Sequence, residues 1–235
     1  MNLAIDLGNT LAKIGCFKNR QLLPGQHAVP FEKLEGIVAE KNPDRIIISS
    51  VNQKIQKLNF TLGKNVMVLG HKTPLPITIN YKTPETLGKD RIAAVVGAYM
   101  GKPATNTLVI DIGTCITYDF INDKNEYLGG AISPGVEMKL KAMNTFTARL
   151  PLVHMVDDVN LIGNTTEEAL QSGAINGTKA EIEEIIRMYS DKFRNLRFVI
   201  CGGGAEYFGS RLKSTVEICP ELVLIGLNGI LEYNA

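Results

Sequence analysis

The sequence predicts an α/β protein made of two related halves. One segment, Leu108–Phe120 (LVIDIGTCITYDF), is an apolar run that ends in Asp111 and leads through a glycine turn into a second β-rich run. The beginning of the chain, Leu3–Phe17 (LAIDLGNTLAKIGCF), repeats this order with an Asp, a Gly and a Thr in matching places. Repeats this far apart suggest two halves that face each other across a cleft.

Composition excludes several classes of protein. With 235 residues, of which 45% are hydrophobic and 21% charged, the chain can form one large or two modest soluble domains. A net charge of +1 without a Lys/Arg block gives no reason to expect a nucleic-acid partner. No stretch approaches about 18 uninterrupted apolar residues, and the N-terminus does not have the pattern of a signal peptide. We therefore expect no membrane span and a cytoplasmic location.

Cysteines and histidines are scattered and show no metal-ligand spacing. We expect the cysteines to be buried, reduced thiols and the histidines to lie in loops or at the surface. These residues are Cys16, Cys115, Cys201, Cys219, His27, His71 and His154.

Hydrophobic spacing and chain breakers predict the elements of the first half. The expected strands are 2–7, 11–17, a looser one over 20–29, 45–50 and 66–69, with a tight turn at Gly8-Asn9. Helices are expected over 31–41 and 51–62. Residues 71–86 contain three prolines and should be extended, either as a connector or as a loop that faces the substrate.

Asp90–Met100 (DRIAAVVGAYM) is apolar nearly all round, which indicates a buried helix. Asp90 is expected at its N-cap or in its first turn, where the helix dipole favours a carboxylate. An Asp there, next to Arg91, suits a base that takes a hydroxyl proton while the cation holds an anionic substrate. The alternative is a capping Asp with a surface ion pair.

The second half continues with a hairpin over 107–121 and a strand over 126–133, followed by a helix that runs from Pro134-Gly135 to about Phe146. Residues 147–163 are expected to be irregular. The later elements are a helix over 166–189, a strand over 197–201, a helix after Gly204, a strand over 216–219 and a C-terminal helix from Pro220. No linker separates the halves, so we divide the chain into domains of residues 1–104 and 105–235.

The helix that begins at Thr166 carries small residues, Gly173, Ala174 and Gly177, on one side. They suggest the close approach of another helix, as in a dimer interface. The alternative is that the glycines pack against the chain's own sheet.

The pattern of the two hairpins favours a phosphate-binding function. The P-loop and GxGxxG motifs are absent. Asp6 and Asp111, each at a strand exit, can orient a hydrated cation that neutralises phosphate oxygens. Lys13 can add a positive charge, and turn N–H groups and hydroxyls come from Gly8, Asn9, Thr10, Gly113 and Thr114. A single hairpin of this kind could be an ordinary turn, but the matched pair indicates a nucleotide.

Three glycines, Gly202 to Gly204, follow a buried strand. Their lack of side chains lets a flat ring lie against the backbone, so they would hold adenosine.

Taken together, these segments resemble the type III pantothenate kinases, members of the acetate and sugar kinase, heat-shock chaperone and actin superfamily. The segments that carry the resemblance lie in the family's order and span nearly the whole chain: DLGNT (6–10), GKDR (88–91), DIGTCITYD (111–119), GGAISPG (129–135), GNTTEEALQSG (163–173) and CGGGA (201–205). The resemblance implies a duplicated ribonuclease-H-like (actin-like ATPase) fold with two domains around a nucleotide cleft.

It also implies ATP-dependent phosphorylation of pantothenate to 4'-phosphopantothenate, the first step towards coenzyme A, with Asp90 as proton acceptor. The residues implied for ATP are Asp6, Leu7, Gly8, Asn9, Thr10, Leu11, Ala12, Lys13, Thr114, Gly202 and Gly203. Those implied for pantothenate are Tyr81, Gly88, Lys89, Asp90, Arg91 and Thr166, with Thr165 as the alternative to Thr166.

The family's cations and assembly follow by the same resemblance. Asp111 would hold potassium or ammonium, Asp6 would act on magnesium through water, and Thr166 would complete the pantothenate pocket of a partner in a homodimer. Cys115-Ile116 departs from the Ala-Thr that many members have. The alternative functions are a kinase for another small hydroxy acid or sugar, and a non-catalytic nucleotide-binding regulator.

Overall fold

The computed structural model describes residues 1–8, 11–25, 28–50 and 65–235. The chain packs into two compact units. Unit 1 comprises Met1–Thr105, Ile121–Gly129 and Glu221–Ala235, and unit 2 comprises Asn106–Phe120 and Gly130–Pro220. The first segment of unit 1 ends one residue after the division predicted at 104, whereas the C-terminal helix, expected in the second domain, packs in unit 1. The predicted helix over 51–62, the turn residue Asn9 and His27 lie outside the described residues.

Unit 1 contains a sheet in the strand order β3-β2-β1-β5-β6. Strand β1 (Asn2–Leu7) pairs antiparallel with β2 (Ala12–Lys18) and parallel with β5 (Arg45–Ser50). Strand β6 (Val66–Val68) extends the sheet parallel to β5. These strands confirm the predictions made from their apolar runs.

The single loose strand predicted over 20–29 is wrong in detail. Two short strands, β3 (Gln21–Leu22) and β4 (Ala28–Val29), each pair antiparallel with β2. Pro24 lies between them, and proline has no backbone N–H to donate to a ladder, so one continuous strand is not formed.

A 3₁₀ turn η1 (Phe31–Lys33) and helix α1 (Leu34–Lys41) follow the strands and together confirm the helix predicted over 31–41. Helix α1 buries Leu34 and Val38 against the core of the sheet. It ends at Asn42, which takes the left-handed conformation that asparagine tolerates.

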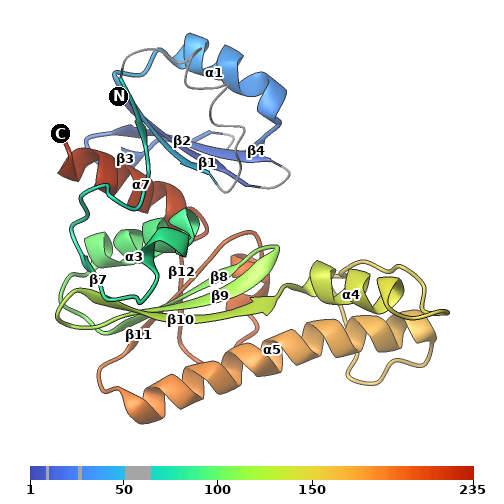
Figure 1. The fold of residues 1–235 in the computed structure, drawn as a ribbon. Coiled ribbons are helices and arrows are strands. Elements are labelled where there is room, and N and C mark those ends of the chain that lie inside the picture. Colours follow the sequence, from blue (N-terminus) through green and yellow to red (C-terminus); the bar gives the residue numbers. More distant parts are fainter. Residues whose placement is uncertain (9–10, 26–27, 51–64) are drawn as a thin grey trace. The chain divides into compact units, whose positions relative to one another are not determined.

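Two apolar helices, α3 (Lys89–Gly101) and α7 (Leu222–Tyr233), pack side by side in unit 1 (Figure 1). Their backbones approach closely, because a Cβ on Gly226 would lie 1.7 Å from the carbonyl oxygen of Ala93. The amide of Asn2 on β1 donates a buried 2.9 Å hydrogen bond to Asn228 on α7. The C-terminal helix therefore belongs to the core around β1.

The proline-containing stretch 71–86 is extended only in part. It contains a short strand β7 (Thr78–Ile79), which pairs parallel with Glu126 and Tyr127 of β10, and a 3₁₀ turn η2 (Pro84–Thr86). The expectation of an extended chain is wrong for η2. Pro84 stands at the start of this turn, where its fixed φ is compatible with a helical conformation.

Unit 2 holds most of a second sheet in the order β12-β11-β8-β9-β10-β7. Its strands are β8 (Thr107–Ile112), β9 (Cys115–Ile121), β10 (Glu126–Pro134), β11 (Arg197–Cys201) and β12 (Glu217–Ile218). The predicted hairpin and the later strands are confirmed. Strands β8 and β11 are parallel, with Asp111 paired with Cys201.

Helix α5 (Thr166–Lys192) runs along this sheet and extends past it beside α4 (Val136–Thr145) (Figure 1). Both helix predictions are confirmed, with α5 ending three residues later than predicted, and 147–163 is irregular as expected. Helix α5 buries Leu170, Ala174 and Ile175, whereas Ala169 is exposed. A short helix α6 (Ala205–Gly209) follows the glycine loop.

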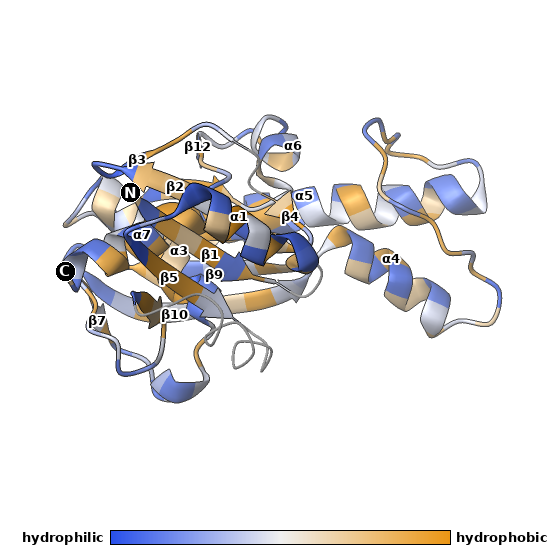
Figure 2. Ribbon diagram, turned by 90° about the horizontal axis from the view of Figure 1, so that it is seen from above, coloured by the Kyte–Doolittle hydropathy of each residue, from blue (hydrophilic) through white to orange (hydrophobic). Residues whose placement is uncertain are grey.

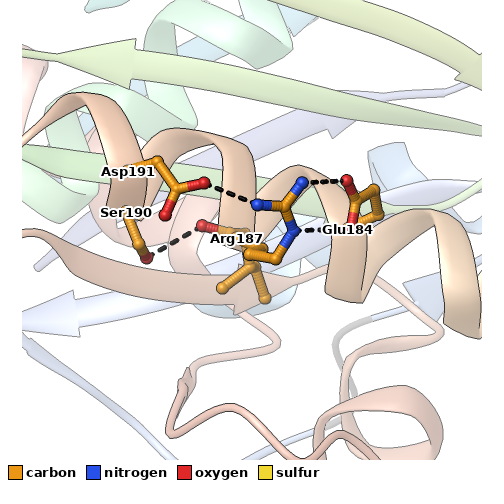
Figure 3. Close-up of polar contacts among 5 residues, drawn as sticks. Glu184, Arg187, Ser190 and Asp191 are labelled. Carbon is orange, nitrogen blue, oxygen red and sulfur yellow. Dashed lines mark hydrogen bonds and ion pairs between the residues drawn. The ribbon is translucent and has the colours of Figure 1, made fainter.

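The C-terminal half of α5 has a charged outer face (Figure 3). The Arg187 guanidinium donates to both carboxylate oxygens of Glu184 and, at 2.6 Å, to Asp191. Pairs at this spacing support an exposed helix.

None of the four cysteines forms a disulfide bond. Cys201 is buried as predicted, but the prediction of burial is wrong for Cys16, Cys115 and Cys219, which are half-buried. Within the described part of the chain, no group of three His, Cys, Asp or Glu residues could hold a metal ion. None of the helices in these same residues has the length and hydropathy that a bilayer crossing requires.

Candidate active site

Asp6 lies near the end of β1, between two paired strands. Its position is opposite Lys13 on β2 and opposite Ser49 on β5. Paired positions of neighbouring strands project to the same face of a sheet, so these three side chains share one face.

The environment of Asp6 is unusual for a carboxylate. Burial raises its pKa to about 6, and the negative charge of Asp90 acts in the same direction. The positive charge of Lys13 and the hydroxyl of Ser49 oppose this rise. The structure therefore brings together Asp6, Asp90 and Lys13, three residues chosen from the sequence for phosphate and proton chemistry.

Asp90 lies in the first turn of α3, as predicted, with Gly88 at the N-cap. Its Oδ1 accepts a 2.9 Å hydrogen bond from the N–H of Arg91. The Arg91 side chain is only 7% exposed, so the alternative of a surface ion pair does not describe this segment. The Lys89 ammonium donates to the carbonyl of Leu87 at 3.0 Å, and burial lowers its pKa.

Tyr81, also in unit 1, is half-buried in an aromatic contact. Its ring centroid lies 6.0 Å from that of Tyr127. The edge of its ring faces Gly129, where a Cβ would lie 3.2 Å from Cε2.

The other predicted nucleotide residues of unit 1 surround the β1–β2 turn. Asn9 and Thr10 lie outside the described residues. Gly8 N–H donates to the carbonyl of Leu11 at 3.2 Å, and Leu11 is exposed. Leu7 and Ala12 are buried in the core, so only their backbone groups are available to a ligand.

In unit 2, Asp111 follows the apolar residues of β8 and lies against the glycine loop. Gly202 has φ +85°, and a Cβ there would be 2.1 Å from Oδ1 of Asp111. Only glycine satisfies both conditions. Gly203 is exposed, and a Cβ on it would meet nothing within 4 Å.

The Gly113-Thr114 turn joins β8 to β9, and Thr114 is exposed. The carbonyl oxygen of Thr114 accepts a 3.0 Å hydrogen bond from Gly135. The predicted motifs around Asp111, Thr114 and Gly202 therefore meet at the carboxyl ends of β8 and β11.

The two adjacent threonines at the start of α5 have different environments. Thr165 is the N-cap, and its hydroxyl accepts from the N–H of Glu168 at 3.2 Å. The Glu168 carboxylate accepts in return from the N–H of Asn164 at 2.9 Å, which completes a capping box. Thr166, the first helical residue, is exposed.

The donor atoms fit the cations that the resemblance implies. The half-buried Asp6 carboxyl has a raised pKa and has Asp90 as a neighbour, so a divalent cation would relieve the repulsion between the two. Near Asp111, carboxylate and backbone carbonyl oxygens are the hard donors that alkali cations prefer.

Sequence reasoning missed one residue of the site, Ser49. It is fully buried on β5 beside Asp6. The two serines at the end of the apolar run RIIISS could have indicated this residue.

A family profile described as type III pantothenate kinase matches residues 2–188. The chain belongs to the type III pantothenate kinase family. It is 43% identical to a protein named type III pantothenate kinase from Cytophaga hutchinsonii, over 235 residues that cover 100% of both chains.

Solved structures support the fold. A Baf family protein from Campylobacter jejuni superposes with a TM-score of 0.68 at 22% identity, covering 99% of this chain and 98% of that one. MreB5 of Spiroplasma citri bound to ADP, an actin-like protein, gives a TM-score of 0.50 at 12% identity, covering 99% and 96%. The predicted actin-like α/β fold is confirmed.

Proposed function

We propose that this protein transfers a phosphoryl group from ATP to pantothenate, giving ADP and 4'-phosphopantothenate, the first step towards coenzyme A. The observation that carries this proposal is the meeting of Asp6, Asp90 and Lys13 in unit 1 of a chain that belongs to this family. A cluster of two carboxylates and a cation offers both a metal-binding group and a base.

Asp90 is the proposed base. It accepts the proton of the attacking pantothenate hydroxyl while that oxygen attacks the γ-phosphorus in line with the leaving ADP. Asp6 would hold a hydrated magnesium ion, which would neutralise phosphate charge. Positioning and electrostatics supply most of the rate enhancement in this kind of reaction.

We propose that the β1–β2 segment Asp6–Lys13 of unit 1 contacts ATP, and we assign a nucleotide-contact role separately to Thr114, Gly202 and Gly203 of unit 2. The open surface of Gly203 and the exposure of Thr114 support this. Asp111 is the proposed ligand of potassium or ammonium.

For pantothenate we propose Tyr81, the segment Gly88–Arg91 and Thr166. The Thr165 hydroxyl already serves as a helix cap, which favours Thr166 as the substrate contact.

We also propose a homodimer in which Thr166 completes the partner's pantothenate pocket. Gly173 and Gly177 are exposed, and a Cβ on either would meet no described atom within 4 Å, which supports an interface over these two glycines. Ala174, the third small residue predicted on this side, packs instead in the chain's own core. The nearby surface carries large exposed apolar side chains, and Figure 2 shows hydrophobic segments along α4 and the loop after it. These side chains are Phe146, Leu152, Leu161 and Ile162. Exposed apolar groups of this size are typical of an interface.

The cytoplasm is the proposed location, because the four free thiols fit a reducing compartment.

An ADP-release assay tests the function. The purified protein with ATP, magnesium and potassium should release ADP with pantothenate, and not with acetate or a panel of sugars. Release with a sugar but not with pantothenate would favour the alternative kinase. Nucleotide binding without release for any acceptor would favour the non-catalytic regulator.

A further inference from the structure

The Ser49 hydroxyl is a buried polar group that forms no hydrogen bond of ordinary geometry within the described part of the chain. The residue is 0% exposed, and its Oγ forms no hydrogen bond with any residue in the described part of the chain. Buried hydroxyls are nearly always paired, because an unpaired one lowers the stability of the fold. The presence of a serine at this position therefore needs an explanation other than the stability of the fold.

The neighbours of Ser49 indicate what that explanation is. On β1, its paired position is Asp6, whose side chain projects to the same face. On the other side, β6 pairs with Ile46, Ile47 and Ile48 and so ends before Ser49. Although no hydrogen bond of ordinary geometry joins them, the Ser49 hydroxyl lies close enough to lower the pKa of Asp6.

We propose that Ser49 is a positioning residue for Asp6, and that its hydroxyl donates to the Asp6 carboxylate when magnesium and nucleotide are bound. The hydrogen bond holds one carboxylate oxygen and directs the other towards the hydrated cation. This proposal rests on the proposed function, because it assigns Asp6 to the magnesium-nucleotide complex.

The lack of an ordinary Ser49–Asp6 hydrogen bond in the free protein is compatible with this positioning role. Hydrogen bonds in active sites are often long or misaligned in the free enzyme and shorten in the complex. A hydrogen bond that forms only in the complex with magnesium and nucleotide stabilises that complex selectively. Alanine at position 49 would remove the unpaired hydroxyl and also its weak interaction with the Asp6 carboxylate, so these opposing effects leave the free protein without a stability reason for serine.

The test compares the full-length wild type with Ser49→Ala, Ser49→Thr and Ile47→Val. Ile47 lies two residues earlier on the same strand, is also 0% exposed, and its change removes one methyl group without affecting a hydroxyl. Two quantities are measured for each protein: the thermal unfolding midpoint without ligand, and ADP affinity by calorimetry with magnesium and with EDTA.

We expect Ser49→Ala to keep or raise the unfolding midpoint, while ADP affinity with magnesium falls by about tenfold, because hydrogen bonds to charged groups are strong. Its ADP affinity in EDTA should not change. Ser49→Thr, which keeps a hydroxyl, should recover most of the magnesium-dependent affinity. Ile47→Val should lower the midpoint and leave the affinity unchanged.

Two results would overturn the proposal. One is wild-type ADP affinity with magnesium in Ser49→Ala, and the other is an equal loss of affinity with and without magnesium. Failure of the proposed function is a separate result: wild-type protein that binds Mg–ADP but does not phosphorylate pantothenate. A wild type that binds ADP equally well with and without magnesium would overturn the proposal for Ser49, whereas the proposed function would still be decided by product formation.

Discussion

The carboxyl groups of Asp6 on β1 and Asp90 on α3 interact within unit 1, where burial and the charge of Asp90 raise the pKa of Asp6 to about 6. The two residues lie far apart in the sequence and come from different kinds of element. We assign them different roles, Asp6 on the cation side and Asp90 on the acceptor side.

The first prediction concerns the base. Asp90→Asn should lower kcat by roughly 10²–10⁴-fold, because the amide cannot accept the hydroxyl proton. ADP affinity, measured by calorimetry, should be retained. A variant with kcat within about threefold of wild type would remove Asp90 from the mechanism.

The second prediction concerns the stability of the free protein. The ordinary pKa of an aspartate, 3.8, is raised to about 6 for Asp6 in the fold, so the folded state binds this proton more tightly. The contribution of Asp6 to the free energy of unfolding should therefore fall as pH rises from about 4 to about 6. Asp6→Asn removes this dependence and should be more stable than wild type at pH 7, by up to about 3 kcal/mol.

Urea denaturation at a series of pH values measures this effect. Wild type and Asp6→Asn should converge in stability below about pH 4, where Asp6 is protonated in both states. Equal stability at pH 7, or a gap that widens towards low pH, would contradict a raised pKa for Asp6.

The third prediction concerns the monovalent cation. We expect potassium or ammonium to activate the wild type over sodium, and Asp111→Ala should abolish that activation. Gly202→Ala should have the same effect, because its Cβ would be 2.1 Å from Oδ1 of Asp111 at a φ of +85°.

Gly203→Ala is the matched control for this prediction, since a Cβ there meets nothing within 4 Å. It should retain the ratio of activity in potassium to activity in sodium and the unfolding midpoint of wild type. Full wild-type activity in sodium-only buffer, unchanged in Asp111→Ala, would reject the cation assignment.

The fourth prediction separates adjacent threonines. Thr165→Ala removes the cap of α5 and should lower stability by about 0.5–2 kcal/mol with little change in KM. Thr166→Ala should leave stability nearly unchanged and raise KM for pantothenate more than KM for ATP. Steady-state kinetics and thermal unfolding of both variants test the pair, and the opposite pattern would assign the substrate contact to Thr165.

The fifth prediction concerns association. Gly173→Leu adds a side chain where the chain itself leaves open space, so the subunit should fold, but the bulk should weaken the dimer and its activity together. Gly36→Leu, also on a helix with nothing within 4 Å, should leave the dimer intact. Light scattering measures the association of both variants.

Subunit mixing extends the fifth prediction. Inactive Asp90→Asn and an inactive Thr166 variant should recover some activity when mixed, because one pocket of the heterodimer has both intact residues. A fully active wild-type monomer at assay concentration would exclude the shared pocket.

Local sequence patterns predicted much of the fold. The apolar runs that end in Asp6 and Asp111 correspond to β1 and β8, and the buried helix expected from Asp90 corresponds to α3. These predictions succeed because each depends on residues within one element. The extended chain expected around Pro84 was wrong, because proline allows the start of a 3₁₀ turn as readily as an extended chain.

Long-range packing could not be predicted from local sequence patterns. The register that puts Ser49 beside Asp6 joins strands with much chain between them, and nothing within RIIISS identifies its partner. Similarly, the apolar pattern of α7 shows that it is buried but not that Gly226 lies against Ala93 of α3. The sequence also left open whether Gly173 packs on the chain's own sheet, whereas in the structure a Cβ there would meet no described atom within 4 Å.

The most direct test of the central claim is mass spectrometry of the product. Purified protein with ATP, magnesium, potassium and pantothenate should form phosphopantothenate in amounts equal to the ADP released, and Asp90→Asn should form almost none. If wild-type protein that binds ATP leaves pantothenate unmodified under these conditions, or if Asp90→Asn forms the product at the wild-type rate, the account is contradicted.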